Sequence, residues 1–523
     1  MFGLFSFFRG KEPHYLDSVK AADLWIGELA QRDGYEAHKM LVEALSTFIG
    51  NAAPLSRQRL KVLMRLDECS LEFQRDIARK YLECQGRSQR GEYPLWKSAA
   101  IFFRHLADGY QAFFRDIVAN REHSVGEKYL PLVVARTLHY CGMAIRWGYF
   151  RQETVQPIMW RRLHKSYLLS EASGFAEAEV ALSSGALTTC GGEYVQILLL
   201  DVINPACLRP LQVELAGRWL DNWSGLVKLE KRCDPAIHMH CVDLSAGGGA
   251  RKLVDGANGD ALRCWGMADL YGHLRKVRAG LSKGGEIRDL VPEGMDCSLP
   301  ECLALLDDIS RHWVRPAPAR KQERMASDKA VEMACGVGAI RHCLQPEGAK
   351  KAAGKRPASY QYWAVENESQ GGYGLVEAKP AERAEPGKLV CVKTTGSGAA
   401  WEIGVVRWKK GASGQPALGI EKLSDEPKHV ELSPAGEPSN DGEAEEASSG
   451  KTISAVFLPK WYDREIDSSL IFHPPDYADG RQLDMHYRNN VIRIRLTEVV
   501  DKTEEWVRVK FDILGHRSAA TRS

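Results

Sequence analysis

Apolar residues recur with a helical period along the N-terminal part of this chain of 523 residues. The spacing of Leu60, Leu63, Met64 and Leu71 places these side chains on one face of a helix. The pattern predicts an all-α helical domain over 17–314, and because no repeat of fixed length is present, a bundle of antiparallel helices is expected. The long helical segments are expected at 17–48, 58–84, 94–119, 129–149 and 153–171.

A short β insertion is expected to interrupt this domain at about 225–254. Residues 226–229 and 237–243 alternate between apolar and polar side chains, as strands with one buried face do. The run Ser-Ala-Gly-Gly-Gly-Ala at 245–250 then predicts a turn or β-bulge. The helical pattern is therefore broken by strands rather than by a simple loop.

Two further helices are expected at the end of the helical domain. One runs from Leu262 to Leu281, with Leu270, Leu274, Val277 and Leu281 on one face. The other begins at Ser298, because Ser298 and Glu301 form the S-x-x-E pattern of a capping box. It is expected to stop by Arg315, since a residue that precedes proline is pushed out of the α region.

Short alternating segments separated by turn residues follow, and they predict an antiparallel β-barrel over 315–435. Its strands are expected at 331–334, 362–365, 389–393, 401–408 and 418–421. Residues 347–359 are basic and poor in apolar side chains, so we interpret them as a solvated loop inserted between the first two strands.

A second all-β group is expected over 452–514, as a half-barrel packed on the first barrel or as a small separate unit. Residues 436–451 are acidic and rich in Ser and Gly, which is typical of a linker. Tails are expected at 1–16 and 515–523. The fold class is therefore multidomain α+β: an N-terminal all-α domain with a short β insertion, an antiparallel β-barrel and a C-terminal all-β extension.

The charge balance argues against a protein that binds bulk nucleic acid. Lys and Arg number 70 and Asp and Glu number 68, which leaves a net charge of +2. No global field directs the chain to nucleic acid or to an anionic membrane, so any basic site must be local. Neither a nucleic-acid partner nor an integral membrane segment is expected, because no apolar run reaches the length of a membrane-spanning helix.

The cysteines and the N-terminus favour a cytoplasmic protein. None of the 13 cysteines forms a C-x-x-C pair, and residues such as Cys69, Cys141 and Cys302 lie in apolar helical contexts where a free thiol packs as a small hydrophobe. The apolar run at 1–9 is too short for a signal peptide. Its phenylalanines leave a weak peripheral membrane anchor as the alternative to a frayed or docked terminus.

Two short motifs carry the candidate chemistry. Arg320 and Arg324 form an R-x-x-x-R pattern just before the first strand of the barrel. Asn367, Ser369 and Gly372 form N-x-S-x-x-G just after the strand that contains a tryptophan. Either motif occurs by chance, the first in any basic chain and the second as an ordinary turn in which glycine adopts a positive φ. Their order along the chain is what makes them informative.

This order resembles the PilZ domain of bacterial cyclic di-GMP receptors. The resemblance covers 315–424 and continues through WAVENESQGGYGL at 363–375, GKLV at 387–390, GVVRW at 404–408 and LGIEKL at 418–423. It implies a PilZ-like antiparallel β-barrel whose ligand is cyclic di-GMP, with no other cofactor and no metal. The gap between the two motifs is longer than this family usually has, because the basic loop is inserted there.

The chemistry of the ligand agrees with what the resemblance implies. Cyclic di-GMP carries two phosphates and two guanines, and an arginine guanidinium binds either group with paired hydrogen bonds. Arg320 and Arg324 are therefore expected to contact the ligand, together with Asn367, Ser369 and Gly372. The alternative sources of cationic or backbone contacts are Arg315, Lys321, Lys351, Lys355, Arg356 and Gly371.

Three other patterns are candidate sites. Residues 243–248 also read D-x-S-x-x-G, but no R-x-x-x-R precedes them and helix follows, so a turn is favoured over a second nucleotide or phosphate contact. His238 and His240 lie on one strand face and could bind a metal, although a solvated strand face is the simpler interpretation. Trp363, Trp401 and Trp408 follow the strand spacing, which favours barrel core over platforms for stacking bases.

These observations predict a cytoplasmic bacterial receptor for cyclic di-GMP rather than an enzyme. Neither G-x-S-x-G nor H-E-x-x-H nor a P-loop occurs in the chain. Binding is expected to rearrange the barrel against the helical domain, and the helical domain is expected to bind a protein partner. The alternative is a degenerate PilZ-like scaffold that binds no nucleotide.

Overall fold

The computed structural model describes the chain in two compact units, 1–319 and 320–523. The residues it describes are 15–51, 53–84, 89–119, 126–254, 256–257, 259–292, 295, 297–314, 324–345, 360–376, 384–396, 400–410, 417–435, 452–461, 466–487, 490–503 and 505–518. The expected N-terminal anchor, the basic loop 347–359 and the acidic linker 436–451 lie outside these residues. Of the expected tails, the structure describes 15–16 and 515–518.

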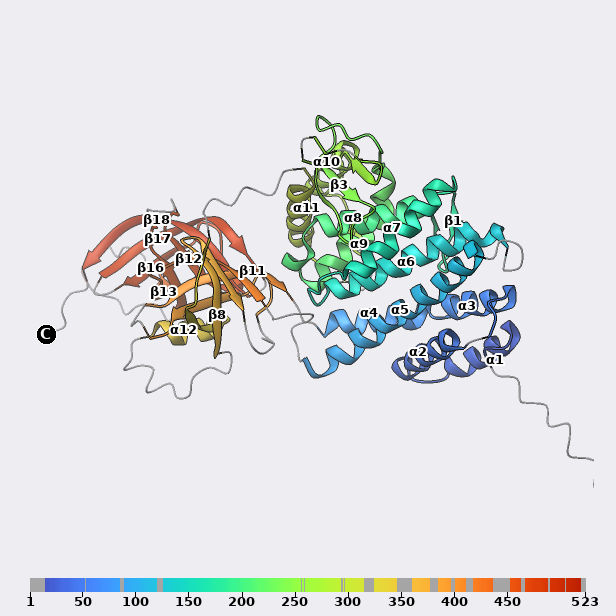
Figure 1. Ribbon diagram of the computed structural model, residues 1–523. Coiled ribbons are helices and arrows are strands. Elements are labelled where there is room, and N and C mark those ends of the chain that lie inside the picture. The colour runs from blue at the N-terminus through green and yellow to red at the C-terminus, as the bar shows by residue number, and fades with distance from the viewer. Residues whose placement is uncertain are drawn as a thin grey trace, which may run out of the picture. The chain divides into compact units, whose positions relative to one another are not determined.

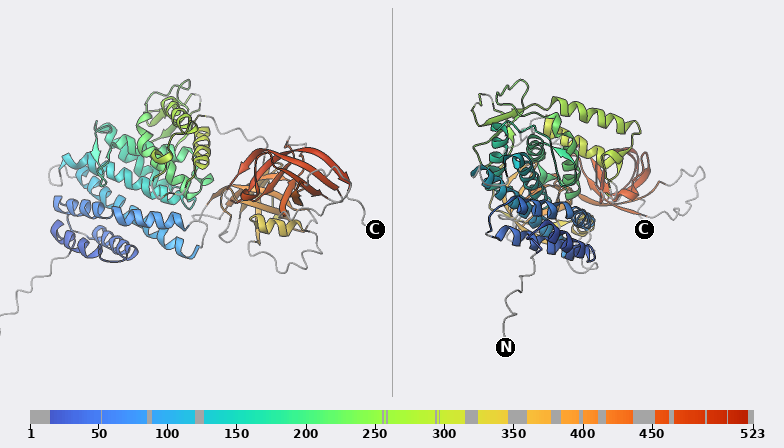
Figure 2. Two further views of the ribbon diagram at one scale, coloured as in Figure 1. Left: turned by 180° about the vertical axis from the view of Figure 1, so that it is seen from behind. Right: turned by 90° about the vertical axis from the view of Figure 1, so that its right-hand side faces the viewer.

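The first unit is a helical array with two small sheets (Figure 1). Its helices are α1 (Val19–Leu29), α2 (Gly34–Gly50), α3 (Arg57–Cys69), α4 (Leu71–Glu83), α5 (Gln89–Ala119), α6 (Leu130–Tyr149), α7 (Pro157–Ala172), α8 (Cys190–Val202), α9 (Pro210–Trp223), α10 (Ala268–Ser282) and α11 (Leu299–Val314). The left view of Figure 2 shows α5 and α6 side by side, in agreement with the close approach of their backbones. The expected all-α domain is confirmed.

Local capping divides two of the expected long helices. Asp33 caps α2 by accepting hydrogen bonds from the backbone N–H groups of Tyr35 and Glu36, so the segment 17–48 is two helices rather than one. Ser70 ends α3 and begins α4 within 58–84. Both predictions of a continuous helix were wrong because periodicity alone does not register an N-cap residue inside a helical pattern.

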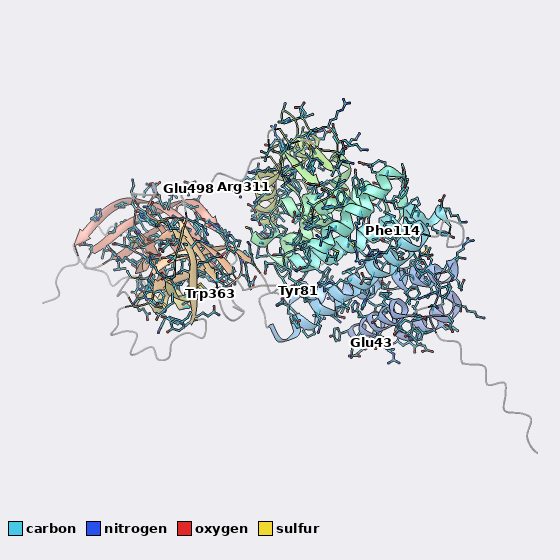
Figure 3. All side chains as sticks on the ribbon, viewed as in Figure 1. Glu43, Tyr81, Phe114, Arg311, Trp363 and Glu498 are labelled. Carbon is cyan, nitrogen blue, oxygen red and sulfur yellow. A yellow bond between two sulfur atoms is a disulfide. The ribbon has the colours of Figure 1, made fainter. Side chains whose placement is uncertain are left out.

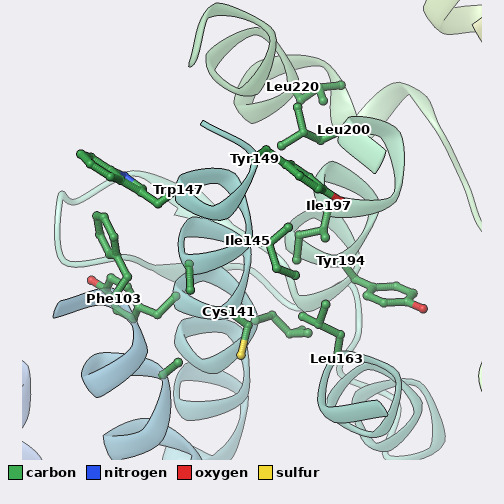
Figure 4. Packing of buried hydrophobic residues seen from close by; sticks show 14 of the residues in the cluster. Phe103, Cys141, Ile145, Trp147, Tyr149, Leu163, Tyr194, Ile197, Leu200 and Leu220 are labelled. Carbon is green, nitrogen blue, oxygen red and sulfur yellow. The ribbon is translucent and has the colours of Figure 1, made fainter. Parts of the chain in front are cut away.

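The centre of the helical unit is α6, which is buried on several sides (Figure 4). Gly142 allows this close packing, since a Cβ there would lie 2.9 Å from Ile197 of α8. Cys141 and Ile145 lie in the same cluster and face Leu163 of α7. Among the described residues, no helix combines the length and the apolar composition needed to cross a bilayer.

The β insertion is larger than expected. Its three-stranded sheet has the order β4 (Arg251–Lys252), β3 (His240–Asp243) and β5 (Leu262–Trp265). Helix α10 therefore begins at Ala268, and the predicted helical start at Leu262 was wrong because all four residues of β5 are buried against β3. A disulfide joins Cys233 to Cys264, a pairing that the cysteine spacing did not predict. The expected strand 226–229 is not formed; a 3-10 turn ends at Leu226 and one β-bridge joins Glu230 to Cys264.

The second unit begins with the expected antiparallel barrel. Its strands are β6 (Met325–Ala326), β7 (Ala330–Cys335), β8 (Tyr360–Ser369), β9 (Gly372–Val376), β10 (Leu389–Thr394), β11 (Glu402–Lys410) and β12 (Ala417–Ser424). The order is β6-β8-β7-β10-β11-β12-β9, and β8 also pairs with β9, which closes the sheet. A helix that the sequence analysis missed, α12 (Val337–Leu344), follows β7.

Both faces of the central strands are buried. In β10, Val390 and Val392 face the interior of the barrel with Trp363, whereas Leu389 and Cys391 face α12 and the second barrel. Figure 3 labels Trp363 within this first barrel. Alternation with period two therefore sends apolar residues to two different cores, which explains why β10 has a continuous apolar sequence.

The C-terminal group is a closed six-stranded barrel rather than a half-barrel. Its strands, in the order of the barrel, are β13 (Lys428–Pro434), β14 (Ile453–Leu458), β15 (Ser469–Phe472), β18 (Val507–Ser518), β17 (Asn490–Lys502) and β16 (Gln482–Tyr487). Strand β13 lies within the range expected for the first barrel, but it pairs with β14 and β16. Strand β18 continues to Ser518, beyond the expected start of a tail at 515.

The two barrels share a buried junction. Helix α12 lies between them, and the Arg341 guanidinium donates to the carbonyl of Ser454 in β14. The indole Nε1 of Trp506, a fully buried side chain, donates to the carbonyl of Gly387 at 3.1 Å. These contacts make the second unit one continuous packed body, which confirms the predicted multidomain α+β class with a C-terminal all-β part.

Candidate functional site

The candidate site lies at one edge of the first barrel, where a short strand brings the two sequence motifs together. Strand β6 directly follows Arg324 and pairs with β8 through Met325–Glu368 and Ala326–Asn367. As a result, Nη1 of Arg324 donates a hydrogen bond of 2.6 Å to Oδ1 of Asn367, across 43 residues of sequence. The last residue of the R-x-x-x-R pattern and the first residue of N-x-S-x-x-G are thus direct partners.

The Asn367 side chain occupies space that a neighbouring glycine leaves open. Asn367 pairs with Gly374 across β8 and β9, and a Cβ on Gly374 would lie 2.6 Å from Oδ1 of Asn367. The amide Nδ2 also donates to Glu366 at 3.2 Å. Sequence reasoning missed Gly374 as a site residue, although an isolated glycine inside a strand is a signal of close approach.

Gly372 is required for a different reason from the one expected. Its φ is not positive, so the turn does not need the conformational freedom of glycine at this position. Instead, a Cβ on Gly372 would overlap the carbonyl oxygen of Ile420 in β12. The motif glycine therefore allows β12 to approach β9 at the closure of the barrel.

Ser369, Gln370, Gly371 and Gly372 form the hairpin that joins β8 to β9. Ser369 and Gly372 are directly opposite, so Gln370 and Gly371 are a two-residue turn. The carbonyl of Gly371 accepts a hydrogen bond of 3.0 Å from the N–H of Lys422 in β12. Ser369 is half-buried at this edge.

A cluster of polar side chains supports the hairpin from the neighbouring strands. The Tyr373 hydroxyl donates to Glu402 at 2.8 Å, and Nζ of Lys422 lies 3.1 Å from the same carboxylate and 4.1 Å from the Tyr373 ring centroid. Burial raises the pKa of Tyr373, and the negative charge of Glu402 adds to the effect. Tyr373 therefore stays protonated and keeps β9 bonded to β11.

The other predicted cationic residues fall outside the description. Arg315, Arg320 and Lys321 precede Arg324 in the chain, and Lys351, Lys355 and Arg356 belong to the basic loop. All six lie outside the described residues. The structure thus brings together Arg324, Asn367, Ser369, Gly371 and Gly372 of the predicted set.

The three tryptophans near the site differ in how deeply they are packed. Trp363 is 2% exposed and belongs to the barrel core. Trp401 is half-buried and packs against the core shared with the second barrel. Trp408 covers Gly419 in the neighbouring strand, where no Cβ would fit. These contacts account for the three rings through packing.

The second D-x-S-x-x-G sequence forms an ordinary turn after β3. Oδ1 of Asp243 accepts from the Ser245 N–H at 2.9 Å and from its hydroxyl at 2.6 Å, an Asx-type turn.

His238 and His240 are buried, so the prediction that they lie on a solvated strand face was wrong. His238 accepts from the Asp234 N–H at 2.9 Å, and His240 stacks on Trp265. In the part of the chain that the structure describes, no cluster of His, Cys, Asp and Glu is arranged to bind a metal.

Comparison with protein families gives two matches. Residues 20–235 match the family described as "Cyclic-di-GMP receptor FimW, N-terminal domain". Residues 341–428 match "Cyclic-di-GMP receptor FimW, middle PilZ domain". Together they cover more than half of the chain, and the second includes the N-x-S-x-x-G hairpin but begins after Arg324. No curated protein matches the chain.

Proposed function

The chain belongs to the family of cyclic-di-GMP receptors that carry a PilZ domain, and from this membership we propose that it binds cyclic di-GMP at the barrel edge formed by β6, β8 and β9. The proposed contacts are Arg320, Arg324, Asn367, Ser369 and Gly372. Arg315, Lys321 and Gly371 are secondary candidates. No metal or further cofactor takes part in this proposal.

The observation that carries the proposal is the hydrogen bond between Arg324 and Asn367. An arginine guanidinium binds phosphate or the O6/N7 edge of guanine best when it is already oriented. Asn367 orients the half-buried Arg324 side chain at the barrel edge, and the space beside Gly374 fixes Asn367 in turn. This arrangement lowers the entropic cost of holding the guanidinium against a ligand.

The position of the arginine motif supports a role in signal relay. Residues 315–324 join α11, the last helix of the first unit, to β6 of the second, and the boundary between the units falls at Arg320. A ligand held by Arg320 and Arg324 would restrict this connection. We expect binding to change how the helical domain and the barrel are arranged, and the helical domain to pass the signal to a protein partner in the bacterial cytoplasm.

Isothermal titration of the full chain with cyclic di-GMP tests the proposal. The parent protein should bind saturably, and Arg320→Ala/Arg324→Ala should lose at least about tenfold in affinity, because a charge-assisted contact is typically worth about 1.5–3 kcal/mol. Arg495→Ala is the matched control, since Arg495 is an exposed arginine on β17 of the second barrel. It should bind like the parent.

Two other outcomes would change the conclusion in different ways. Undiminished binding by the double variant would keep the receptor and move the cationic contacts to Arg315 or to the basic loop at 351–356. No binding by a correctly folded parent would favour a PilZ-like scaffold that acts through its helical domain without a nucleotide.

A further inference from the structure

The helical unit contains a basic cleft between α5 and α7 that is separate from the barrel. Its volume is about 320 Å³. Five cationic side chains line it, two from α5 and three from α7: Arg104, Arg115, Arg161, Arg162 and Lys165. The α5 residues are spaced so that they share one helix face, as are the α7 residues. Two basic helix faces therefore converge on one cleft.

The positive charge of this cleft is largely uncompensated. Asp108 is the one carboxylate among the lining residues, and it already pairs with Arg162 at 2.6 Å. Arg104 is close enough to Glu153 to oppose the rise that burial causes in the pKa of that carboxyl. Within the described part of the chain, Arg115, Arg161 and Lys165 form no ion pair. Like charges gathered in this way repel one another unless an anion is present.

A buried amide also faces the cleft. Gln111 is 6% exposed and lines the cleft from α5. Its side chain forms no hydrogen bond with any residue that the structure describes. The polar atoms of this amide are not enclosed, so in the free protein they bond to water in the cleft. A ligand in the cleft would replace that water as the hydrogen-bond partner.

The glycine-rich turn after β3 braces one wall of the cleft. A Cβ on Gly247 would lie 2.8 Å from Nη1 of Arg161 and 3.0 Å from Cβ of Pro157, so this turn packs directly against the start of α7. His164, one turn further along α7, is hydrogen-bonded through Nε2 to the carbonyl of Gly248 at 2.9 Å. The start of α7, which carries Arg161, is thus held by the close approach of Gly247 and by the hydrogen bond of His164 to the Gly248 carbonyl.

We propose that this cleft binds a phosphate-bearing small molecule about the size of a mononucleotide. Its volume lies at the lower end of the range of about 300–1,000 Å³ found for ligand pockets. Arg115, Arg161 and Lys165 would contact phosphate oxygens, and Gln111 would hydrogen-bond a polar group. Ile158, which is 67% exposed, and Met159 provide an apolar wall for a ring. This site lies wholly in the helical unit and does not depend on the function proposed for the barrel.

Titration of the full chain with GMP, inorganic pyrophosphate and guanosine tests the inference. GMP or pyrophosphate should bind saturably, and guanosine, which lacks phosphate, should bind at least about tenfold more weakly than GMP. Arg161→Ala/Lys165→Ala and, separately, Arg115→Ala on the opposite wall should each weaken binding by about tenfold or more. All three side chains are exposed, so these variants should unfold at the parent temperature.

Two control variants separate this cleft from the barrel site. Arg75→Ala removes an exposed arginine of α4 outside the cleft and should leave binding unchanged. Repeating the titration in an Arg324→Ala background removes any GMP bound at the barrel, and the cleft variants should still weaken the binding that remains. The inference is overturned if neither GMP nor pyrophosphate binds the folded parent, if the cleft variants bind as the parent does, or if binding is lost in Arg324→Ala instead.

Discussion

The chain contains the pattern [D/N]-x-S-x-x-G twice, and its two copies have different structures. At Asn367 the pattern spans the hairpin between β8 and β9, and its first side chain is bonded to an arginine from 43 residues earlier. At Asp243 the pattern forms a turn in which the first side chain is bonded to the serine of the same motif. The first side chain of the Asn367 copy bonds to a distant residue, whereas the first side chain of the Asp243 copy bonds within its own turn.

The glycines of the two copies differ in the same way. Gly372 lies against the β12 backbone and has no room for a Cβ, whereas nothing lies within 4 Å of a Cβ on Gly248. Neither glycine has a positive φ. The same six-residue pattern therefore has two structures. What distinguishes the candidate site is that its first side chain bonds to a distant arginine and its last glycine leaves no room for a Cβ.

The largest expected difference between the two copies is the effect on stability of replacing the last glycine of each with alanine. Gly372→Ala should destabilise the first barrel by about 2 kcal/mol or more, because the new Cβ overlaps the Ile420 carbonyl and strand separation is the only relief. Gly248→Ala should change stability by less than about 0.5 kcal/mol. Hydrogen exchange measured by mass spectrometry should show faster exchange in β9 and β12 for the first variant alone. Equal exchange in the two variants would contradict the close approach of β12.

The sequence predicted the elements of the first barrel because their strands alternate locally and are separated by turn residues. It could not predict the contact between Arg324 and Asn367, which depends on β6 pairing with β8 across the inserted loop. The reason for Gly372 was equally hidden, since Ile420 lies 48 residues away in sequence and meets Gly372 only when the barrel closes.

Similar physical reasons explain the errors in the rest of the fold. Leu262 to Trp265 reads as the start of an amphipathic helix, yet pairing with β3 makes it a buried strand. The sequence left a half-barrel or a small separate unit as the two possibilities for 452–514. It did not reveal the closed barrel because β13 and β16, whose pairing closes it, are separated by the acidic segment and two strands. Local periodicity does not report such long-range closure.

An intermediate effect is expected when the first side chain of each copy is removed. Asn367→Ala should weaken cyclic di-GMP binding by about tenfold, because Arg324 loses the acceptor that orients it. Asp243→Ala should leave the affinity within about twofold, since this residue bonds only within its own turn. Isothermal titration of both variants checks the difference. An equal loss in both would mean that the two copies share a role.

The smallest effect concerns pH, and it separates the copies because only Asp243 titrates. The hydroxyl and N–H of Ser245 bond to the Asp243 carboxylate and lower its pKa below the usual value near 3.8. A lowered folded pKa means that the carboxylate stabilises the turn above about pH 4 and that this contribution disappears as the pH falls through the folded pKa.

An NMR titration measures this pKa. The signal of the Asp243 carboxyl carbon, which is identified because it is missing from the spectrum of Asp243→Asn, should titrate below the usual Asp range. Ser245→Ala should raise the midpoint toward the usual value; a midpoint unchanged by this substitution would show that the turn does not hold the carboxylate. The Asn367 amide has no such titration, so the orientation of Arg324 should be independent of pH in the same range.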